Sequence, residues 1–419
     1  MKVKNDKHRL TSDELIYFNK PKKVYIPLIS GNDTDITVLV KKGEYVYKGS
    51  MIAKSKGNFR IPIHSSVSGT VLDFEEKKCF NGSKVKCVVV ENDYKEAVEE
   101  KTPIKRSLNK YSKEEFIDLL KENGIIGLGG AGFPTYIKYD NQKIKTLIVN
   151  AVECEPFITA DEILCKTKCE EVLETIDAIL EINNIDKAII AIKESNVELK
   201  SVFDNYIGTY LKIEIKSVRN YYPAGWEKRL VEDITGKQYQ KLPLEVGVVV
   251  NNVSTIYAIY EALKYKKPLI ERIITFSGEK LKTCCNVLVK IGTPIKDVLD
   301  ELGFEGSGII ISGGPMMGIK NDTDLVISSN QNCILVLDEE ECSETNCLKC
   351  GKCIEVCPAK LSPVIIMKNM ESKNKKLDEL NSLQPQKCIE CGLCSYICPA
   401  KILVRERVKK AKQILKEAK

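Results

Sequence analysis

Short apolar runs separated by turn-forming residues dominate the first hundred positions. The runs are rich in Val and Ile, and dipeptides such as Lys48-Gly49 and Asn81-Gly82 stand between them. Short strands joined by regular turns are typical of a small β-barrel or sandwich. Residues 1–20 are polar and lack this pattern, which predicts an arm. The expected strands lie at residues 24–29, 36–40, 51–53, 69–72 and 87–90.

After a charged linker, the pattern changes to alternating helices and strands. Ser112-x-x-Glu115 forms a capping box at the start of a short amphipathic helix, and Asn123-Gly124 ends that helix. The following elements are a strand, a helix, a strand, a helix and a strand, at residues 146–149, 160–181, 187–192, 194–206 and 212–217. This alternation predicts a doubly wound α/β domain.

A third pattern covers residues 268–318. Two strands are followed by a helix and another strand, which suits a β-grasp module, and the pair Met316-Met317 is expected in its core or at an interface. These elements lie at 272–277, 287–291, 295–302 and 308–311. The chain is therefore expected to be a multidomain α/β protein, with domains at 1–105, 110–265, 266–330 and 335–419.

Two similar cysteine runs fill the last of these regions. Each reads C-x2-C-x2-C-x3-C-P, the spacing of two-cluster ferredoxins, in which three cysteines bind one cubane and the fourth reaches the other. The runs are Cys347, Cys350, Cys353, Cys357 and Cys388, Cys391, Cys394, Cys398. They predict an α-helical domain with two [4Fe-4S] clusters. Cluster one is assigned to Cys347, Cys350, Cys353 and Cys398, and cluster two to Cys388, Cys391, Cys394 and Cys357.

A pair of zinc sites is the alternative to the two clusters. Zinc is satisfied by two C-x2-C pairs and does not require a third cysteine followed by Cys-Pro in both runs. Cys342 precedes the first run at the plant-type spacing, but the complete run downstream leaves it without a necessary ligand role. The sequence therefore favours iron–sulfur chemistry over zinc.

Composition narrows the possible partners and the compartment. The chain has 419 residues, 17 Cys, 2 His and a net charge of +6, which is too small to indicate nucleic acid. The odd number of cysteines and the lack of a signal-peptide pattern favour a reducing cytoplasm, and no apolar run is long enough to span a membrane. The basic segment 405–419 is expected to be a solvated helix face; docking on an acidic partner or on the inner face of a membrane is the alternative.

Polar and glycine-rich loops in the α/β region are the candidate ligand site. The loop Gly127-Leu-Gly-Gly-Ala-Gly-Phe-Pro-Thr135 lets the backbone approach a ligand closely, although a tight structural turn would explain it equally well. A buried strand ends at Asn150-Ala-Val-Glu-Cys-Glu-Pro156, and ligands bind at the carboxyl ends of such strands. The segments 222–227 and 251–255 carry further polar residues.

The N-terminal region resembles the barrel-sandwich hybrid of lipoyl and biotinyl carriers. The resemblance rests on the glycine spacing of residues 40–49 and on His64-Ser-Ser-Val-Ser-Gly-Thr-Val71. Residues 54–58 lack the Met-Lys-Met turn that carries the modified lysine, so a structural or docking module is expected instead of a swinging carrier. His64 is expected to be packed or hydrogen-bonded.

Four motifs in order resemble the flavin- and NADH-binding subunit of respiratory complex I, and more closely RnfC, a component of the Rnf electron-transport complex. They are GlyGlyAlaGlyPheProThr, AsnAlaValGluCysGluPro, the TyrPro…Gly-x-Glu turn and AsnAsnVal-x-Thr. The resemblance covers about residues 24–405 and implies a barrel, a flavin fold, a β-grasp (SLBB-like) module and two ferredoxin runs. It also implies an FMN site formed by Gly127, Gly129, Gly130, Lys138, Asn150, Glu153, Asn251, Asn252 and Thr255. The last three of these residues would hold the phosphate end of the cofactor.

The resemblance further implies that NADH is the electron donor. Phe133 would stack on the nicotinamide nucleotide, and Glu155 and Glu227 would bind its hydroxyls. Trp226 departs from the family pattern, which has a small or acidic residue in this turn. It would either stack on a ring or narrow the nucleotide entrance.

The vicinal pair Cys284-Cys285 is unusual for this family. The two residues are either ordinary buried thiols or a redox dithiol that exchanges with a partner. The N-terminus also departs from the family, since it lacks the usual glycine- and histidine-containing opening and the Gln-His pair after the first strand. A dithiol and this altered N-terminus point toward a branch of amino-acid-fermenting anaerobes, the electron-transfer proteins associated with proline reductase.

The function expected from the sequence is electron transfer from NADH, through FMN and two clusters, to a partner reductase, with proline reductase first. RnfC of an NADH:ferredoxin oxidoreductase and a cobalamin reductase are alternatives. An iron–sulfur relay without flavin, which would not be an enzyme, is an alternative of another class. A cytoplasmic protein is expected, with peripheral membrane association as an option.

Overall fold

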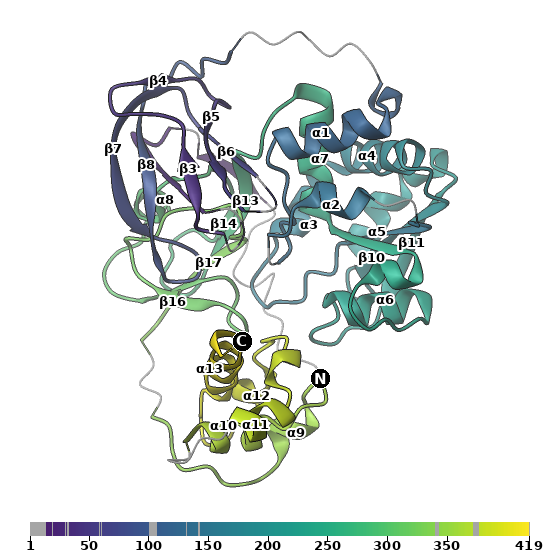
Figure 1. Ribbon diagram of the computed structural model, residues 1–419, viewed down its shortest axis with the longest axis vertical. Helices are drawn as coiled ribbons and strands as arrows, with labels where there is room; N and C mark the ends of the chain where they lie inside the picture. The colour runs from purple at the N-terminus through teal and green to yellow at the C-terminus, as the bar shows by residue number, and fades with distance from the viewer. Residues whose placement is uncertain are drawn as a thin grey trace.

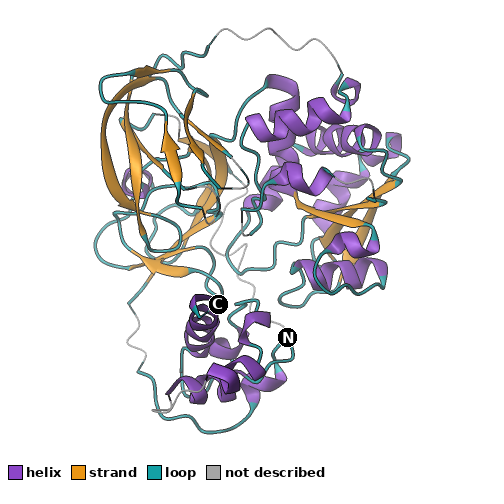
Figure 2. Cartoon of the chain, in the orientation of Figure 1, coloured by secondary structure: helices purple, strands orange, loops and turns teal. Residues whose placement is uncertain are grey.

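The computed structural model describes residues 14–99, 107–339, 343–371 and 377–418, except 19, 30, 32, 58, 60, 131, 141 and 142. Figure 1 shows the N-terminal strands beside the green strands labelled β13, β14 and β17, the α/β domain next to them, and the yellow helical unit below. Figure 2 shows that helices dominate the last of these units and strands the first. None of the described helices is long and apolar enough to cross a bilayer.

The N-terminal unit consists of two antiparallel sheets that enclose a Val- and Ile-rich core. Apolar side chains such as Val24 and Ile26 alternate inward along one strand, as half-buried strands require. The order of the first sheet is β2 (Lys23–Pro27), β8 (Lys84–Asn92), β7 (Gly69–Lys78), β4 (Tyr45–Val46). The order of the second is β3 (Ile36–Val38), β5 (Met51–Ser55), β6 (Pro62–His64). All five expected strands are present, together with the two very short strands β4 and β6.

The six-stranded sheet extends beyond the predicted β-grasp module. Its order is β1 (Leu15–Phe18), β14 (Cys285–Lys290), β13 (Glu271–Ser277), β17 (Cys333–Leu337), β15 (Ile309–Ser312), β16 (Ile319–Asn321), and α8 (Ile295–Glu301) accompanies it. The prediction of an unstructured arm over residues 1–20 is wrong at residues 15–18, which pair in parallel with β14. Ile16 and Phe18 pack on the core of this module. This burial depends on pairing with the edge of a sheet whose strands lie far away in the sequence. Residues 1–13 lie outside the described chain.

The central domain is built on a parallel sheet ordered β11 (Ile213–Val218), β10 (Lys187–Lys193), β9 (Thr146–Asn150), β12 (Val248–Asn252). The capping box is present: the Glu115 N–H donates to Ser112 Oγ at 3.2 Å, and the Ser112 N–H donates to Glu115 Oε2 at 2.8 Å. The helices are α1 (Lys113–Glu122), α2 (Thr135–Tyr139), α3 (Ala160–Thr167), α4 (Cys169–Ile182), α5 (Val197–Asp204), α6 (Glu227–Thr235) and α7 (Val253–Tyr265).

The single helix expected at 160–181 is two helices that break at Lys168. Its backbone leaves the helical region, with φ −132° and ψ 31°. Both halves pack on α7, but α3 also contacts α5 and β13, whereas α4 also contacts β10 and the turn at Leu108–Lys110. Tertiary packing therefore divides a segment whose apolar periodicity is continuous.

The C-terminal helical unit repeats the same backbone conformation in both cysteine runs. Positive φ angles occur at equivalent positions, Lys349 (55°) with Glu390 (58°) and Gly351 (77°) with Gly392 (80°). Each glycine precedes a short helix, α9 (Lys352–Glu355) or α12 (Leu393–Tyr396). The helices α10 (Pro363–Glu371), α11 (Leu377–Ser382) and α13 (Val404–Glu417) complete the unit around a shared apolar core.

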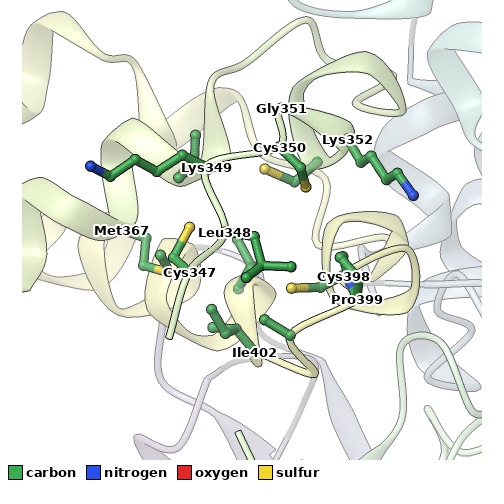
Figure 3. A pocket seen from close by; sticks show the side chains of 14 residues that line it. Cys347, Leu348, Lys349, Cys350, Gly351, Lys352, Met367, Cys398, Pro399 and Ile402 are labelled. Carbon is green, nitrogen blue, oxygen red and sulfur yellow. The ribbon is translucent and has the colours of Figure 1, made fainter. Parts of the chain in front are cut away.

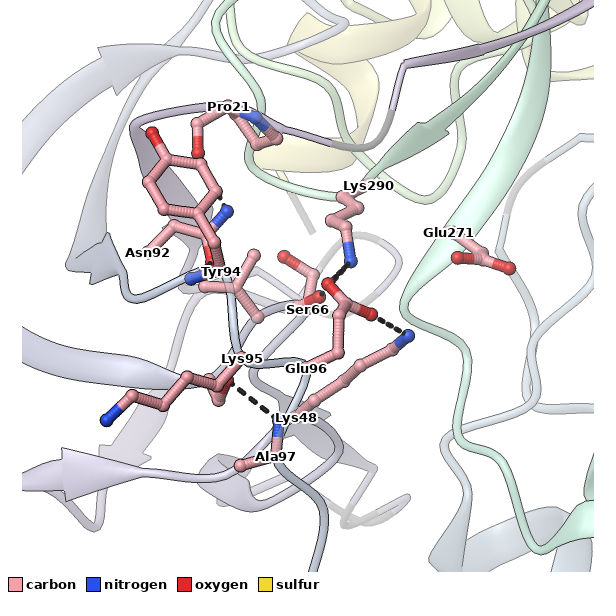
Figure 4. Close-up of polar contacts among 12 residues, drawn as sticks. Pro21, Lys48, Ser66, Asn92, Tyr94, Lys95, Glu96, Ala97, Glu271 and Lys290 are labelled. Carbon is pink, nitrogen blue, oxygen red and sulfur yellow. Dashed lines mark hydrogen bonds and ion pairs between the residues drawn. The ribbon is translucent and has the colours of Figure 1, made fainter.

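An ion-pair cluster around one buried lysine joins the barrel to the six-stranded sheet. Lys290 of β14 has a side chain only 3% exposed and pairs with Glu96, which also pairs with Lys48 (Figure 4). Burial lowers the pKa of Lys290, and the hydrogen bond that Lys290 Nζ donates to Glu96 opposes that shift. The Tyr25 N–H also donates to the Gly292 carbonyl at 2.7 Å. Because a buried charge without a partner is costly, this pairing fixes the two units in one arrangement.

Candidate functional site

Four cysteines line one cavity in the helical unit. Cys347, Cys350 and Cys353 come from the first run and Cys398 from the second, which is the grouping that the ferredoxin spacing predicts. In Figure 3, Cys347, Cys350 and Cys398 surround Leu348, and the ends of Lys349 and Lys352 point away from the cavity. No nitrogen or carboxylate ligand residue joins the sulfur donors that line this space.

The other four cysteines line a second cavity, where Cys357 of the first run joins Cys388, Cys391 and Cys394. Burial, and then the neighbouring thiols, raise the pKa of Cys391 to about 11. Burial likewise raises the pKa of Cys394 to about 12. Among the described residues, no group of three or more His, Cys, Asp or Glu side chains is arranged to hold a metal ion directly. Each cavity is lined by four sulfur donors. This arrangement fits an inorganic iron–sulfur cluster better than a zinc site, in which four ligands coordinate a single ion.

The glycine-rich loop lies at the carboxyl edge of the parallel sheet, against the start of α7. The Gly127 N–H donates to the Phe133 carbonyl at 2.8 Å, and the Leu128 N–H donates to Thr255 Oγ1 at 2.9 Å. A Cβ on Gly129 would stand 2.7 Å from Asn252 Cβ, so only glycine allows this approach. Gly130 has no atom within 4 Å of a Cβ position and leaves open space beside the loop.

Two polar residues near this loop fit a flavin that completes their contacts. Asn251 is 1% exposed and donates its amide N–H to the Tyr139 hydroxyl, while its Oδ1 has no hydrogen-bond partner. Such an orphaned buried acceptor is costly unless a further group satisfies it. Lys138 Nζ donates to the Val250 carbonyl at 2.7 Å, and burial lowers the pKa of this ammonium. The donor set and the glycine loop therefore fit FMN.

The start of α7 is already occupied by a carboxylate that the sequence did not reveal. Asp161 Oδ2 accepts from Asn252 Nδ2 at 2.6 Å, and Asp161 Oδ1 accepts from Ser254 Oγ at 2.6 Å. The Asp161 N–H in turn donates to Glu153 Oε1 at 3.1 Å. This geometry departs from the expected phosphate contact at Asn252 and Thr255, because an internal anion already lies there. Asp161 is an ordinary first-turn acid of a helix in sequence terms, so no local pattern indicates this role.

The remaining flavin and nicotinamide candidates are spread over a wider region. Asn150 Nδ2 donates to the Gly225 carbonyl at 2.9 Å, which links β9 to the turn before α6. Phe133 is 41% exposed and meets Phe59 edge to face, with ring centroids 5.8 Å apart. Glu227 accepts from the Tyr239 hydroxyl at 3.2 Å and lies close enough to Lys138 to favour its charged form. An exposed aromatic ring is free to stack on a ligand, as predicted for Phe133.

Glu155 lies at the junction of three units, where both of its carboxylate oxygens contact other parts of the protein. Its Oε2 accepts from the Met316 N–H at 3.1 Å, and its Oε1 lies 3.2 Å from the Tyr222 hydroxyl. That hydroxyl also donates to the Cys391 carbonyl at 2.8 Å. Burial raises the pKa of Glu155 to about 7. With both oxygens engaged inside the protein, the predicted contact with a nicotinamide nucleotide is not supported.

Two glycines allow the three units to approach closely at this junction, because neither carries a side chain. A Cβ on Gly314 would overlap the Glu155 carboxylate, and a Cβ on Gly392 would overlap the Met316 carbonyl. Arg405 donates to the Met316 carbonyl at 2.6 Å and to the Gly318 carbonyl at 3.0 Å. The apolar cluster here includes Cys154, Tyr222, Met316, Cys391 and Leu393. The flavin domain, the loop 313–318 and the second cysteine cavity are thus packed together.

The vicinal thiols lie within the β-grasp core. Cys285 is fully buried on β14, and Cys284 is partly buried with its Sγ 3.4 Å from the Gly278 carbonyl. Burial raises the pKa of both thiols, that of Cys285 to about 12. Thiol–disulfide exchange needs an accessible thiolate, so this environment favours ordinary buried thiols over a dithiol. Cys342 lies outside the described residues.

Three family profiles match the chain. The "RnfC Barrel sandwich hybrid domain" matches residues 1–95, the "Nuo51 FMN-binding domain" matches 120–261, and the "4Fe-4S dicluster domain" matches 346–402. The predicted fold class and cofactor set, FMN and two [4Fe-4S] clusters, are confirmed by these matches. A solved structure, the NAD+-reducing [NiFe]-hydrogenase in the H2-reduced state, is similar in fold. Its TM-score is 0.53 at 18% identity, over 74% of this chain and 63% of that one.

Two curated relatives are similar over most of their length. The C subunit of the Na(+)-translocating ferredoxin:NAD(+) oxidoreductase complex of Acetobacterium woodii is 34% identical over 83% of this chain and 81% of its own. The C subunit of the Proton-translocating ferredoxin:NAD(+) oxidoreductase complex of Clostridium ljungdahlii is 35% identical over 83% of this chain and 78% of its own. The chain therefore belongs to the RnfC family, the C subunits of ion-translocating ferredoxin:NAD(+) oxidoreductase complexes.

Proposed function

We propose that this chain exchanges electrons between NAD(H), a bound FMN and two [4Fe-4S] clusters, as the C subunit of an Rnf-type complex. A flavin exchanges a hydride with a nicotinamide and single electrons with a cluster, which is the chemistry FMN would supply here. The observation that carries the proposal is the contact of Tyr222 with the Cys391 carbonyl. It puts the second cysteine cavity against the domain that contains the flavin fold.

The chain's own residues would have distinct tasks in this scheme. Gly129 and Gly130 let the loop lie close to the cofactor, Asn251 Oδ1 would accept a hydrogen bond from it, and Lys138 would hold a positive charge beside it. Phe133 would stack on the nicotinamide nucleotide from the exposed side of the loop. The eight cysteines would hold the clusters as two crossed sets of four.

The proposed partners are the other subunits of such a complex and a redox protein. The relatives' names support this assignment, and no feature of the described residues favours an amino-acid reductase. The Cys284-Cys285 pair, which suggested that partner, lies in the module core. The proline-reductase branch therefore stays a prediction from sequence.

Anaerobic purification and analysis would test the proposal. We expect one FMN and about eight irons per chain, and bleaching of both the flavin and the cluster absorption on addition of NADH. Eight irons without flavin would instead support the non-enzymatic relay. Flavin reduction by NADH without cluster reduction would contradict the proposed route through the Tyr222 junction.

A further inference from the structure

Arg272 of β13 is a buried cation without an acidic partner. The residue is 6% exposed, and it forms no ion pair with any residue that the structure describes. Its Nη1 donates to the Ser329 carbonyl, while its Nε has no hydrogen-bond partner. Burial lowers the pKa of this guanidinium to about 10, so the group stays charged at neutral pH. A buried charge with incomplete contacts is costly unless a further group completes them.

The strand β13 brings Arg272 from the six-stranded sheet to the edge of the flavin domain. The Thr159 N–H, just before α3, donates to Thr275 Oγ1 of β13 at 3.0 Å. Asp161, in the first turn of α3, lies close enough for its carboxylate to favour the charged form of the guanidinium. The same carboxylate accepts two hydrogen bonds at the start of α7. Arg272 and the region expected to hold the phosphate end of FMN therefore share Asp161 as a neighbour.

The loop that contacts Arg272 also reaches the glycine-rich loop. Ser329, whose carbonyl accepts from Arg272, is followed by Asn330. A Cβ on Gly132 would stand 2.9 Å from the side-chain amide of Asn330. Gly130, two residues earlier, has open space at its Cβ position. Arg272 is thus linked to the candidate flavin site on two sides, through the start of α7 and through the glycine-rich loop.

The residues expected at the phosphate end supply no positive charge. All three are uncharged and already have partners inside the protein: Asn251, Asn252 and Thr255. A phosphate placed here would also be repelled by the Asp161 carboxylate. Lys138, another buried cation of the flavin domain, has its charge favoured by Glu227 and not by Asp161. A further cation on the Asp161 side is therefore needed to hold a phosphate, and Arg272 is such a cation.

We propose that Arg272 binds the phosphate group of FMN, so that the β-grasp module completes a site in the neighbouring domain. This inference rests on the proposed function and goes beyond the FMN-binding profile, whose match ends at residue 261. A guanidinium presents its N–H donors in one plane and matches a phosphate better than an ammonium does. Hydrogen bonds between two charged groups are among the strongest in proteins, so this contact would contribute much of the affinity for the cofactor.

A comparison of FMN with riboflavin would test this inference, because riboflavin lacks only the phosphate. The full chain, with its clusters but freed of flavin, is titrated with each compound, and quenching of flavin fluorescence gives the Kd. We expect Arg272→Gln to raise the Kd for FMN at least about tenfold and to leave the Kd for riboflavin unchanged. Arg272→Lys keeps the charge and should recover part of the loss. An unchanged Kd for FMN, or equal changes for both flavins, would overturn the inference.

The control removes a different guanidinium. Arg407→Gln breaks the pair with Glu344, 2.6 Å apart in the helical unit, and should change the Kd of neither flavin. A rise in the Kd for FMN equal to that of Arg272→Gln would overturn the inference. So would an Arg272→Gln variant that keeps its Kd for FMN and loses affinity for NADH, since Arg272 would then serve the nicotinamide nucleotide.

A measurement on the unaltered protein keeps the inference falsifiable if Arg272→Gln does not fold. A free phosphate monoester loses its second proton with a pKa of about 6. Phosphorus NMR of bound FMN, with the clusters oxidised, should show a constant chemical shift from about pH 5 to 8, because the guanidinium keeps the phosphate doubly charged. A shift that follows that of free FMN would overturn the inference. Failure of both flavins to bind would refute the proposed function itself, whereas tight FMN binding with a contrary result above would refute only the role of Arg272.

Discussion

The two cysteine cavities have the same local design and opposite surroundings. Both include a left-handed glycine followed by a short helix, yet Cys350 of the first is exposed and Cys391 of the second is 8% exposed. The residue after the glycine differs, since Lys352 is exposed on the first run and Leu393 is 2% exposed on the second. A duplicated motif thus specifies similar ligand sets, and the neighbouring units give each set its own role.

The second cavity is covered both by α13 of its own unit and by residues of the other domains. Glu390 pairs with Lys412 at 2.7 Å, and the same ammonium donates to the Cys388 carbonyl at 3.0 Å. Tyr222 and the Met316 carbonyl cover the Cys391-Gly392 turn. Under the proposed function, the buried cavity would exchange electrons with the flavin and the exposed cavity would exchange electrons with a partner. The following variants test that difference.

Loss of a ligand should give the largest effect, and the two cavities should respond differently. Cys394→Ser should remove the second cluster, about half of the iron, and should stop NADH from reducing the first cluster while flavin reduction continues. Cys350→Ser should leave reduction of the second cluster by NADH intact. Iron content and low-temperature EPR after NADH addition would measure both. Equal loss of NADH-reducible signal in the two variants would remove the distinction between the cavities.

The paired glycines offer a matched test of the junction. Both have φ near +80°, so an alanine costs about 1–2 kcal/mol of backbone strain at either position. Gly392→Ala would also overlap the Met316 carbonyl, whereas Gly351→Ala has no atom within 4 Å of its Cβ. We expect Gly392→Ala to lower stability by about 2 kcal/mol more than Gly351→Ala. Similar apparent melting temperatures would mean that the contact with the 313–318 loop is dispensable.

The buried carboxyl of Glu155 should make the junction sensitive to pH. Its folded-state pKa of about 7 lies above the unfolded value near 4.5, so stability from this group is present below pH 4.5 and is lost as pH rises toward 7. Glu155→Gln should remove that dependence, and above pH 7 its free energy of unfolding should exceed that of the unaltered protein by about 3 kcal/mol. Apparent melting temperatures of both proteins, measured from pH 5 to 8, would show this difference in stability. Parallel curves for the two proteins would exclude the carboxyl as the cause.

The Tyr222 hydroxyl should give the smallest effect on stability. Tyr222→Phe removes the hydrogen bond to the Cys391 carbonyl, a loss of about 1 kcal/mol. It should also slow reduction of the second cluster by NADH. Tyr111→Phe is the control, because Tyr111 donates to the Leu263 carbonyl at 2.7 Å within the core of the α/β domain. Stopped-flow absorption should separate the two variants, and equal rates would assign Tyr222 a structural role only.

Local patterns predicted much of the fold. The capping box at Ser112, the strands of the barrel and the alternation of helices and strands in the α/β domain are all present, because each depends on residues close together in the chain. The strand at residues 15–18 was missed, since its partner β14 is some 270 positions away. The break at Lys168 was missed for a similar reason. The helices on either side of it, α3 and α4, pack on partly different elements that are distant in sequence.

The candidate site likewise has features that local motifs predict and features that depend on contacts between distant segments. By itself the sequence determined the family, the cofactor set and the grouping of cysteines, because motif spacing encodes how many donors reach one centre. Only the tertiary structure decided that Glu155 serves a domain junction and that Asp161 occupies the start of α7. It also decided that one cysteine cavity faces the flavin domain and the other faces solvent. Those outcomes depend on contacts such as Tyr222 with Cys391, between segments that share no local pattern.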